Sequence, residues 1–221
     1  MITPINHTNY LYYKSLGFEK VFLTPLGFSR NFLRPQKPVS PGRINILTIA
    51  DLIKLKNIDK VLKALKELVS SFDIHYTIIG QGPEKETLRK MTEDLDLVNT
   101  VDFVSHVAHD QIADEMYKHD IFIMPSYFET FGRVYFEVMA MGVPIICARN
   151  SGIYGIYREG EEGLSVDHKD VDSIVNVLEF LILNPEKRAQ IGLNGKKLVE
   201  RYTWENVAID LQAKYAEIIR D

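Results

Sequence analysis

Cysteine, long apolar runs and clustered basic charge are all scarce in this sequence, and each shortage excludes a class of protein. The 221 residues contain one cysteine, Cys147, which excludes an intrachain disulfide framework and a thiolate-rich metal site. Cys147 lies in the apolar run VPIICA, where we expect a small buried side chain. No apolar stretch approaches the roughly 20 residues of a membrane-spanning helix, and residues 1–14 lack the pattern of a secretory signal. We therefore expect a soluble protein of a reducing compartment, the cytoplasm.

Positive charge is too sparse for a surface that binds polyanions. Lysine and arginine number 26 against 30 acidic residues, the formal net charge is −4, and no basic run exceeds two residues. Nucleic acids and strongly anionic membranes are bound by clustered basic side chains, so neither is an expected partner.

A metal site is not expected either. The six histidines form no HxxxH or HxH pair of the kind that ligates metals. The motifs DVD at 170–172 and DLD at 94–96 resemble the Asp-x-Asp site of some nucleotide-sugar enzymes. A helix N-cap explains Asp170 better, and the polar end of a helix explains 94–96.

From residue 43 onward, short β-rich runs alternate with amphipathic helical stretches, which is typical of a parallel sheet flanked by helices. Strands are predicted at 43–50, 75–80, 100–104, 120–125, 143–148 and 164–166. Helices are predicted at 58–68 with Asn57 as a candidate N-cap, and at 84–96, 110–118, 132–141, 171–183, 186–202 and 204–219. The predicted fold class is α/β with a Rossmann-like parallel sheet.

The chain divides into three expected segments. Residues 1–42 do not follow the alternation, because they hold a helical stretch near 10–16, a strand-like VFLTP and a proline-rich stretch that ends at residue 42. This segment is too short to bury a core of its own, so it is interpreted as the remnant of an N-terminal domain plus a linker. Residues 43–202 form the Rossmann-like domain, and 203–221 form a C-terminal helix.

The stretch ETFGRVYFE carries two carboxylates, Glu129 and Glu137, and the position of the second is unusual. On a helix over 132–141, Glu137 falls inside the apolar stripe that would face the core. An unpaired carboxylate in a core costs several kcal/mol, so Glu137 either has a partner or faces a ligand pocket.

Ligands of open α/β sheets bind at the carboxyl ends of the strands, where loops lead into helices. The loop at 126–133 follows a predicted strand, and its backbone N–H groups would face phosphate or sugar hydroxyls. The residues in question are Thr130, Phe131 and Gly132. Glu129 can accept hydrogen bonds from a sugar, and Glu137 can accept the two vicinal hydroxyls of a ribose. Glu129 alone is better explained as an ordinary first-turn carboxylate, but the pair favours a ligand site.

Two other loops carry weaker signals. Lys54 and Lys56 can neutralise a diphosphate leaving group, although solvated lysines are the ordinary interpretation of such a loop. Gly80 and Gly82 in GQGPE would let a backbone approach a ligand, and a plain turn explains them about as well.

With these residues in place, the sequence resembles the carboxy-terminal, donor-binding half of family 4 (group 1) retaining glycosyltransferases. These enzymes have the GT-B fold, in which two Rossmann-like domains face each other across a cleft. The stretch PSYFETFGRVYFEVMAMGVPIICA matches the family's Glu-x7-Glu block almost position for position. The stretches INILTIADLIKLKNIDKVLKAL, IIGQGPE, VDFVSHV and REGEEGLSV fall in the family's order and spacing. Such an ordered set is far more specific than any single motif.

The resemblance implies a role for each residue of the Glu-x7-Glu block. Glu129 would contact the donor sugar, and Glu137 would contact the ribose. The amides of Phe131 and Gly132 would meet the sugar hydroxyls or the phosphate.

The resemblance also favours a functional role for Lys56 over that of a solvated lysine, because Lys56 matches the lysine that binds the diphosphate in the family. The stretch VSHV, which ends at Val107, lies where the family's backbone meets the base. One position departs from the family, which usually has an arginine where this chain has Asp51. Lys54 would then substitute for that arginine, or the charge would come from elsewhere.

The implied chemistry is transfer of a hexosyl group from a nucleotide diphosphate sugar to a glycan or lipid-linked acceptor, with retention of configuration. No cofactor, metal or side-chain nucleophile is implied. The acceptor site would lie in an amino-terminal domain outside residues 1–221, so this chain alone would bind the donor weakly and transfer nothing. Peripheral association with the inner face of a membrane, through that missing half, stays open.

Two alternatives remain beside this interpretation. The first is a nucleotide-sugar-binding module without catalysis, which the departure at Asp51 favours. The second is another GT-B enzyme, and it has less support. An epimerase would need acid and base groups supplied largely by the missing domain, and a phosphorylase of the pyridoxal phosphate type would need a Schiff-base lysine, for which no clear candidate stands out. A purely structural α/β domain would require that Glu137 be paired within the protein.

Overall fold

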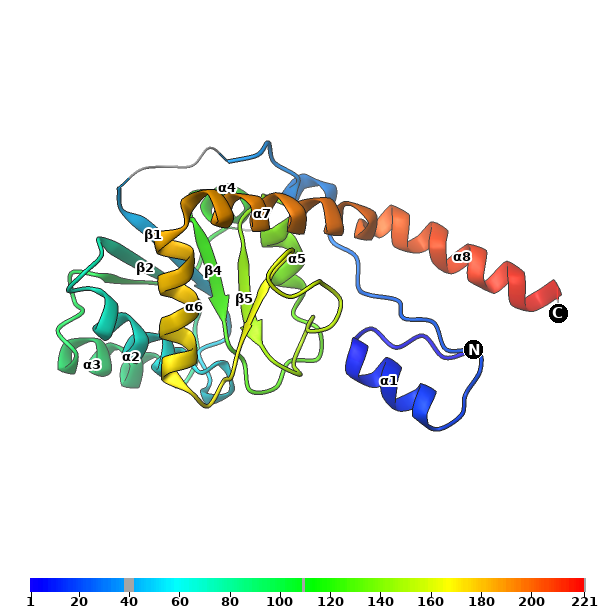
Figure 1. Ribbon diagram of the computed structural model, residues 1–221, viewed down its shortest axis with the longest axis horizontal. Helices are drawn as coiled ribbons and strands as arrows, with labels where there is room; N and C mark the ends of the chain where they lie inside the picture. Colours follow the sequence, from blue (N-terminus) through cyan, green and yellow to red (C-terminus); the bar gives the residue numbers. More distant parts are fainter. Residues whose placement is uncertain (38–41, 109, 221) are drawn as a thin grey trace.

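The computed structural model describes residues 1–37, 42–108 and 110–220. Its centre is a parallel sheet of six strands in the order β3-β2-β1-β4-β5-β6 (Figure 1). The strands are β1 Ile44–Ile49, β2 Ile74–Ile79, β3 Val101–Val104, β4 Ile121–Met124, β5 Ile145–Ala148 and β6 Leu164–Val166. All six predicted strands are therefore confirmed, and so is the Rossmann-like α/β fold.

Helices follow the strands in alternation. The α-helices are α1 His7–Ser15, α2 Ile58–Leu68, α3 Lys85–Asp94, α4 Ile112–Tyr117, α5 Arg133–Met139, α6 Val171–Leu183, α7 Pro185–Val199 and α8 Trp204–Arg220. Short 3-10 turns are η1 Arg30–Phe32, η2 Lys54–Lys56 and η3 Glu200–Tyr202. The predicted helices are confirmed to within about three residues at each end, a common scatter for helix boundaries.

The two faces of the sheet carry separate apolar cores, because successive side chains of a strand point to opposite faces. Along β4, Ile121 and Ile123 join the core beneath α2 and α6, whereas Phe122 and Met124 join the core beneath α4 and α5. Figure 1 shows α2, α3 and α6 together on one side of the sheet. A strand buried on both faces reads as a continuous apolar run, which explains why IFIM was recognisable in the sequence.

The strand order changes direction at the centre of the sheet. The chain runs outward from β1 to β2 and β3, and then returns to place β4 on the other side of β1, with Leu47 beside Phe122. The helices that follow β1 and β4, α2 and α5, therefore lie on opposite faces of the sheet, which leaves a crevice at its carboxyl edge.

Two helix starts test the predicted caps. The side chain of Asp170 accepts a hydrogen bond from the backbone N–H of Asp172, which confirms it as an N-cap. Asn57 occupies the N-cap position of α2, but with a left-handed backbone its side chain makes no cap bond. Its amide donates instead to the carbonyl oxygen of Pro125 at 2.8 Å, so the predicted capping role is wrong. The bond joins the loop after β1 to the end of β4.

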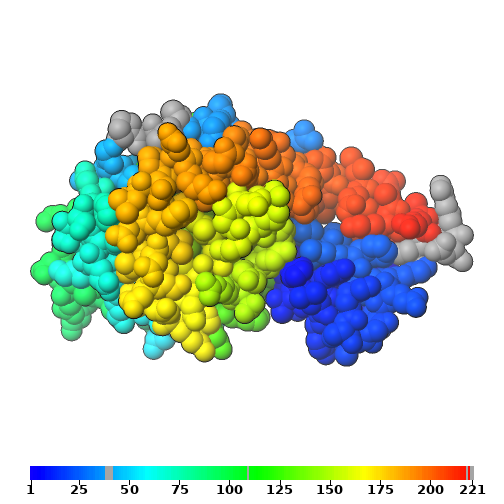
Figure 2. All heavy atoms as spheres, in the orientation of Figure 1, coloured from blue at the N-terminus to red at the C-terminus, as the bar shows by residue number. Residues whose placement is uncertain are grey.

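The amino-terminal residues lie against α8 and not in the sheet. Figures 1 and 2 show this segment, in dark blue, beneath α8 at the end of the molecule where both termini lie. The predicted strand at 21–25 is wrong, because Val21 forms only an isolated bridge with Ile2. Pro4 and Pro25 lack the N–H that a longer ladder requires.

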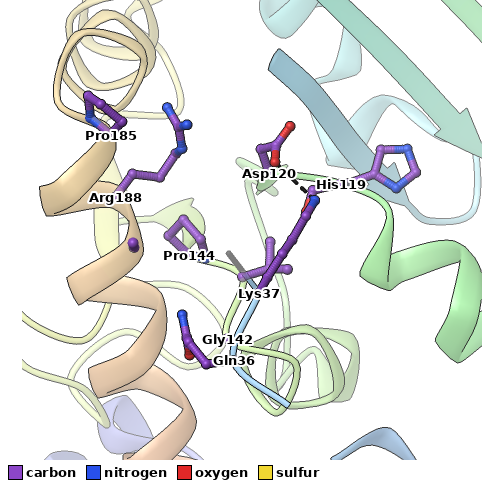
Figure 3. A pocket seen from close by; sticks show the side chains of 10 residues that line it. Gln36, Lys37, His119, Asp120, Gly142, Pro144, Pro185 and Arg188 are labelled. Carbon is purple, nitrogen blue, oxygen red and sulfur yellow. Dashed lines mark hydrogen bonds and ion pairs between the residues drawn. The ribbon is translucent and has the colours of Figure 1, made fainter. Parts of the chain in front are cut away.

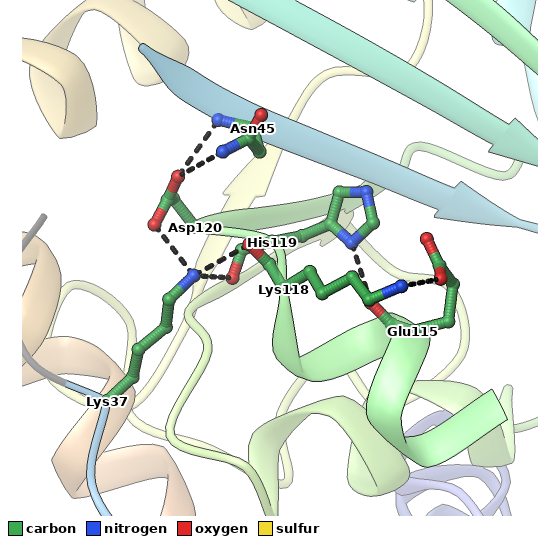
Figure 4. Close-up of polar contacts among 6 residues, drawn as sticks. All are labelled: Lys37, Asn45, Glu115, Lys118, His119 and Asp120. Atoms are coloured by element: carbon green, nitrogen blue, oxygen red, sulfur yellow. Dashed lines mark hydrogen bonds and ion pairs between the residues drawn. The ribbon is translucent and has the colours of Figure 1, made fainter. Parts of the chain in front are cut away.

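The stretch predicted as a linker is described only up to Lys37, since residues 38–41 lie outside the described part of the chain. Its start is fixed to the amino edge of the sheet. The Lys37 ammonium donates to Asp120 Oδ1 at 2.9 Å and to the carbonyl oxygen of His119 at 3.0 Å. Asp120 also accepts the backbone N–H of Asn45 at the start of β1 at 2.9 Å. Figure 4 shows Asp120 between the lysine and the strand.

A buried arginine lies beside this contact. Arg188 of α7 shares with Lys37 and Asp120 the small cavity drawn in Figure 3, of about 30 Å³. Its guanidinium donates to the carbonyl oxygen of Leu181 at 2.8 Å, and burial lowers the pKa of Arg188. The linker, β1, β4 and α7 therefore meet in one polar cluster at the amino edge of the sheet.

Removing the carboxylate of Asp120 tests this cluster. The side chains of Lys37 and Asp120 are only 17% and 6% exposed, so Asp120→Ala leaves a largely buried ammonium without its partner. We expect the free energy of unfolding in urea to fall by about 3 kcal/mol.

The control is Asp73→Ala, which removes a carboxylate that is 64% exposed and pairs with Arg43. We expect a loss of about 0.5 kcal/mol or less. Equal losses in the two variants would contradict the structural role of the Lys37–Asp120 pair.

Candidate functional site

An open pocket of about 540 Å³ lies at the carboxyl edge of the sheet, where the strand order reverses. The loops after β1, β2, β3 and β4 and the first turn of α5 form its walls. The lining residues are Ile49, Ala50, Asp51, Lys56, Ile79, Gly80, Ser105, His106, Val107, Ile112, Met124, Glu129, Gly132, Arg133 and Val134. Four of the predicted site residues thus meet in one pocket: Lys56, Val107, Glu129 and Gly132.

An ion pair joins two walls of this pocket. Lys56 Nζ, in the turn before α2, lies 2.6 Å from Glu129 Oε2 in the loop after β4. The two side chains are 14% and 18% exposed, so the pair is largely shielded from water. A hydrogen bond between the N–H of Tyr127 and the carbonyl oxygen of Leu55 at 2.7 Å holds the same two loops together. The residues predicted to contact the sugar and the diphosphate are therefore direct neighbours.

The loop between β4 and α5 is held by its aromatic residues. Phe131 is buried and packs edge to face on Phe136, with ring centroids 5.0 Å apart. Tyr135 is also buried, and its hydroxyl donates to the carbonyl oxygen of Met124. Gly132 lies between them with a φ of +76°, and a Cβ there would come within 2.6 Å of the Tyr135 ring. This position therefore requires glycine.

Glu137 lies on the buried side of α5, as predicted, and it has a partner within the protein. Its side chain is 13% exposed, and Oε1 accepts a hydrogen bond from Arg133 Nε at 2.9 Å. Burial alone therefore does not require a ligand at Glu137, and that step of the sequence argument was wrong. The partner stands four residues earlier, the spacing at which helical side chains meet.

The remaining predicted residues do not line the pocket. Lys54 is exposed and lines a separate pocket between α2 and α3, with Glu84 and Met91. Thr130 is exposed, and its carbonyl oxygen accepts a hydrogen bond from the Asn6 amide at 2.8 Å.

Gly82 packs against the loop after β1, where a Cβ would lie 2.4 Å from the carbonyl oxygen of Leu52. Its neighbour Gly80 lines the pocket instead. The sequence analysis selected Gly82 as the site residue, whereas the glycine of this turn that lines the pocket is Gly80.

Two charged residues of the pocket did not enter the set of predicted site residues. Asp51, noted as a departure from the family, is exposed at its rim, and Arg133 was not singled out at all. Arg133 was recognisable in the sequence, because it stands one position after the glycine at the start of a helix and four before Glu137.

The described residues contain no group of three or more histidine, cysteine, aspartate or glutamate side chains that could hold a metal ion. Cys147 is buried, as predicted, and burial raises the pKa of its thiol to about 12. A thiol that stays protonated at neutral pH is a poor nucleophile, so Cys147 has a packing role.

The fold and the pocket together define a Rossmann-like domain of the GT-B type. The structure superposes on sucrose-phosphate synthase from Thermosynechococcus elongatus with a TM-score of 0.83 at 20% identity, covering 99% of this chain and 58% of that one. The sequence model of the family "Glycosyl transferases group 1" matches residues 29–198. This chain belongs to the group 1 glycosyl transferases, and the resemblance noted in the sequence is confirmed.

Curated relatives are similar over part of their length. The chain is 32% identical over 175 residues to the sulfoquinovosyl transferase of Arabidopsis thaliana, and the match covers 77% of this chain and 31% of that protein. It is 28% identical over 195 residues to the D-inositol 3-phosphate glycosyltransferase of Rhodococcus erythropolis, and the match covers 84% of this chain and 44% of the relative. The chain therefore spans less than half the length of these relatives.

Two further solved structures share the fold. The Anabaena protein HepE in complex with UDP gives a TM-score of 0.85 at 17% identity, covering 98% of this chain and 64% of that one. The C-terminal domain of the group 1 glycosyl transferase LpcC from Francisella tularensis gives 0.72 at 23% identity, covering 80% of this chain and all of that one.

The loop geometry predicts a large cost for Gly132→Ala. The new methyl group meets the Tyr135 ring, and the φ of +76° is unfavourable for any residue with a Cβ. We expect the free energy of unfolding in urea to fall by about 3 kcal/mol.

Gly160→Ala is the matched control, because Gly160 has a φ of +73° and no atom within 4 Å of an added Cβ. It should lose only the backbone term, about 1 kcal/mol. If the two variants lost the same amount, the packing of Gly132 on Tyr135 would not hold the loop.

Proposed function

We propose that this chain binds a nucleotide diphosphate sugar in the pocket at the carboxyl edge of the sheet. The bound donor would be used for retaining transfer of a hexosyl group to a glycan or lipid-linked acceptor, as in polysaccharide biosynthesis. The observation that carries the proposal is the Lys56–Glu129 pair, which puts a cation and a sugar-binding carboxylate 2.6 Å apart at the switch point of the sheet.

Residues in and beside the pocket have separate tasks in this proposal. The Lys56 ammonium stabilises the negative charge that grows on the leaving diphosphate, which lowers the barrier without a covalent intermediate on the protein. Glu129 accepts hydrogen bonds from the sugar, and Glu137 accepts the ribose hydroxyls. The amide of Gly132 faces the phosphate or the sugar, and the backbone at Val107 borders the base.

The ligand class is supported by what similar proteins are described to bind. One relative, from Mycolicibacterium smegmatis, is named as a GDP-mannose-dependent mannosyltransferase, and it is 29% identical over 168 residues. HepE was solved with UDP. We infer a nucleoside diphosphate as the shared chemistry, with uridine and guanosine as the bases to test. The proposal includes no metal and no cofactor.

The acceptor site and the partner domain belong to the proposal as well. Relatives extend well beyond the matched region, so we propose that a second Rossmann-like domain of the same enzyme binds the acceptor across the cleft. This chain alone would then transfer nothing. We place the reaction in the cytoplasm, with any membrane contact made through that second domain. Among the described residues, no helix has the length and apolar character to cross a bilayer.

A binding module without catalysis is the second candidate. One observation favours it, because Asp51 brings a negative charge to the pocket. Transfer of a sugar by this chain joined to an amino-terminal domain would exclude it.

Calorimetric titration of the chain with UDP, GDP and their sugar conjugates tests the proposed function. We expect saturable binding of one nucleotide, and about tenfold weaker binding in Glu137→Gln, because a ribose hydrogen bond to a charged group is lost.

The matched control is Glu162→Gln. Glu162 is 11% exposed and pairs with an arginine four residues earlier at 2.9 Å, as Glu137 does, but it lines a different pocket, beside α7. Its affinity should stay within twofold of the unchanged chain. If no nucleotide bound, or if Glu137→Gln bound as tightly as Glu162→Gln, the proposal would be wrong.

A further inference from the structure

The charges that line the pocket are nearly balanced before any ligand binds. Among the described lining residues, Lys56 and Arg133 carry permanent positive charge, and Asp51 and Glu129 carry negative charge. A diphosphate brings at least two further negative charges, which need donors whose bonds are not already used.

Lys56 alone does not balance a diphosphate. Its ammonium lies 2.6 Å from Glu129, and both side chains are largely buried. An attraction in such a shielded site is strong, so Glu129 offsets part of the lysine charge before the ligand arrives.

Lys54 cannot supply the missing charge. It was the expected substitute for the arginine that the family has at position 51, but it lines the pocket between α2 and α3. Asp51 itself is exposed at the rim of the site and would repel a phosphate.

Arg133 has the geometry that the other cations lack. It is the first residue of α5, its side chain is 55% exposed, and it lines the pocket. The contact with Glu137 at 2.9 Å uses Nε, and a guanidinium has four further N–H donors on its two terminal nitrogens. Those terminal nitrogens match the spacing of phosphate oxygens.

We propose that Arg133 binds the phosphates of the nucleotide and provides the positive charge that is absent at position 51, with Glu137 holding its guanidinium in place. The inference rests on the proposed function, since it names the residue that selects a diphosphate in that same pocket. Glu137 is then also a positioning residue, which gives a reason for its burial beside an arginine.

Titration of the chain with uridine, UMP and UDP, and with the guanosine series, tests Arg133 directly. In Arg133→Ala we expect binding of the diphosphate to weaken at least tenfold and binding of the nucleoside to change less than twofold, because only the phosphates meet the guanidinium. Arg133→Lys keeps the charge, and its affinity for the diphosphate should lie between that of the unchanged chain and that of Arg133→Ala.

The matched control is Arg43→Ala. Arg43 is also 55% exposed, and its Nε also donates to one carboxylate at 2.9 Å, but it precedes β1 at the opposite edge of the sheet. Its binding should equal that of the unchanged chain.

A positive charge placed at position 51 gives an independent test. Asp51→Arg in the Arg133→Ala background should recover at least half of the lost affinity on a logarithmic scale. Circular dichroism melting of each variant shows that it is folded before titration.

The outcomes separate the two proposals. If the unchanged chain bound neither UDP nor GDP, the proposed function would fail, and this inference with it. If the unchanged chain bound UDP or GDP, the proposed function would stand. The role of Arg133 would be overturned if Arg133→Ala weakened binding of the nucleoside and of the diphosphate equally, or if it weakened neither.

Discussion

The parallel pairing of β1 with β4 is the constraint on which the site depends. These strands are neighbours in the sheet but are separated in the chain by β2, β3 and three helices. Their pairing brings the loop after β1 beside the loop after β4, so that Lys56 meets Glu129 across 73 positions of sequence. The helices that follow the two strands, α2 and α5, lie on opposite faces of the sheet, and the pocket opens between their loops.

The residues beneath the pocket show how that space stays open and ordered. Apolar side chains fill both faces of β4, and the hydroxyl of Tyr135 bonds the end of that strand from within α5. Charged groups occupy the pocket wall in pairs, Lys56 with Glu129 and Arg133 with Glu137. Side chains held by such pairs are fixed in orientation before the ligand arrives, and preorganised charge is the kind that stabilises a leaving group most effectively. The same pairing weakens the attraction for phosphate, so in the proposed function the affinity for the donor is a balance of these two effects.

Much of this was predictable from sequence, and the limits have physical causes. The strands are apolar runs buried on both faces, such as IFIM and IICA, and the helices carry a clear apolar periodicity. The fold class and the order of the elements along the chain were therefore predictable. The carboxyl-edge rule then placed Lys56, Glu129 and Gly132 near one another, and the family resemblance added Val107.

Contacts that depend on tertiary geometry could not be predicted from the sequence. Nothing in GQGPE says which glycine faces the ligand, since that depends on how closely Leu52 approaches Gly82. Lys54 and Lys56 stand two residues apart in a 3-10 turn, and the direction of that turn sends their side chains to different pockets. The partner of Glu137 was visible four residues earlier and was overlooked.

The central claim is that the pocket at the switch point binds the nucleotide, and the most direct test is a map of backbone amide NMR shifts on addition of UDP or GDP. The account predicts that the largest shifts fall together on Gly80, Val107, Glu129 and Gly132, around the pocket. Shifts centred instead on Arg158 and Arg201, which line a separate pocket beside α7, would contradict it, as would the absence of any shift at saturating nucleotide.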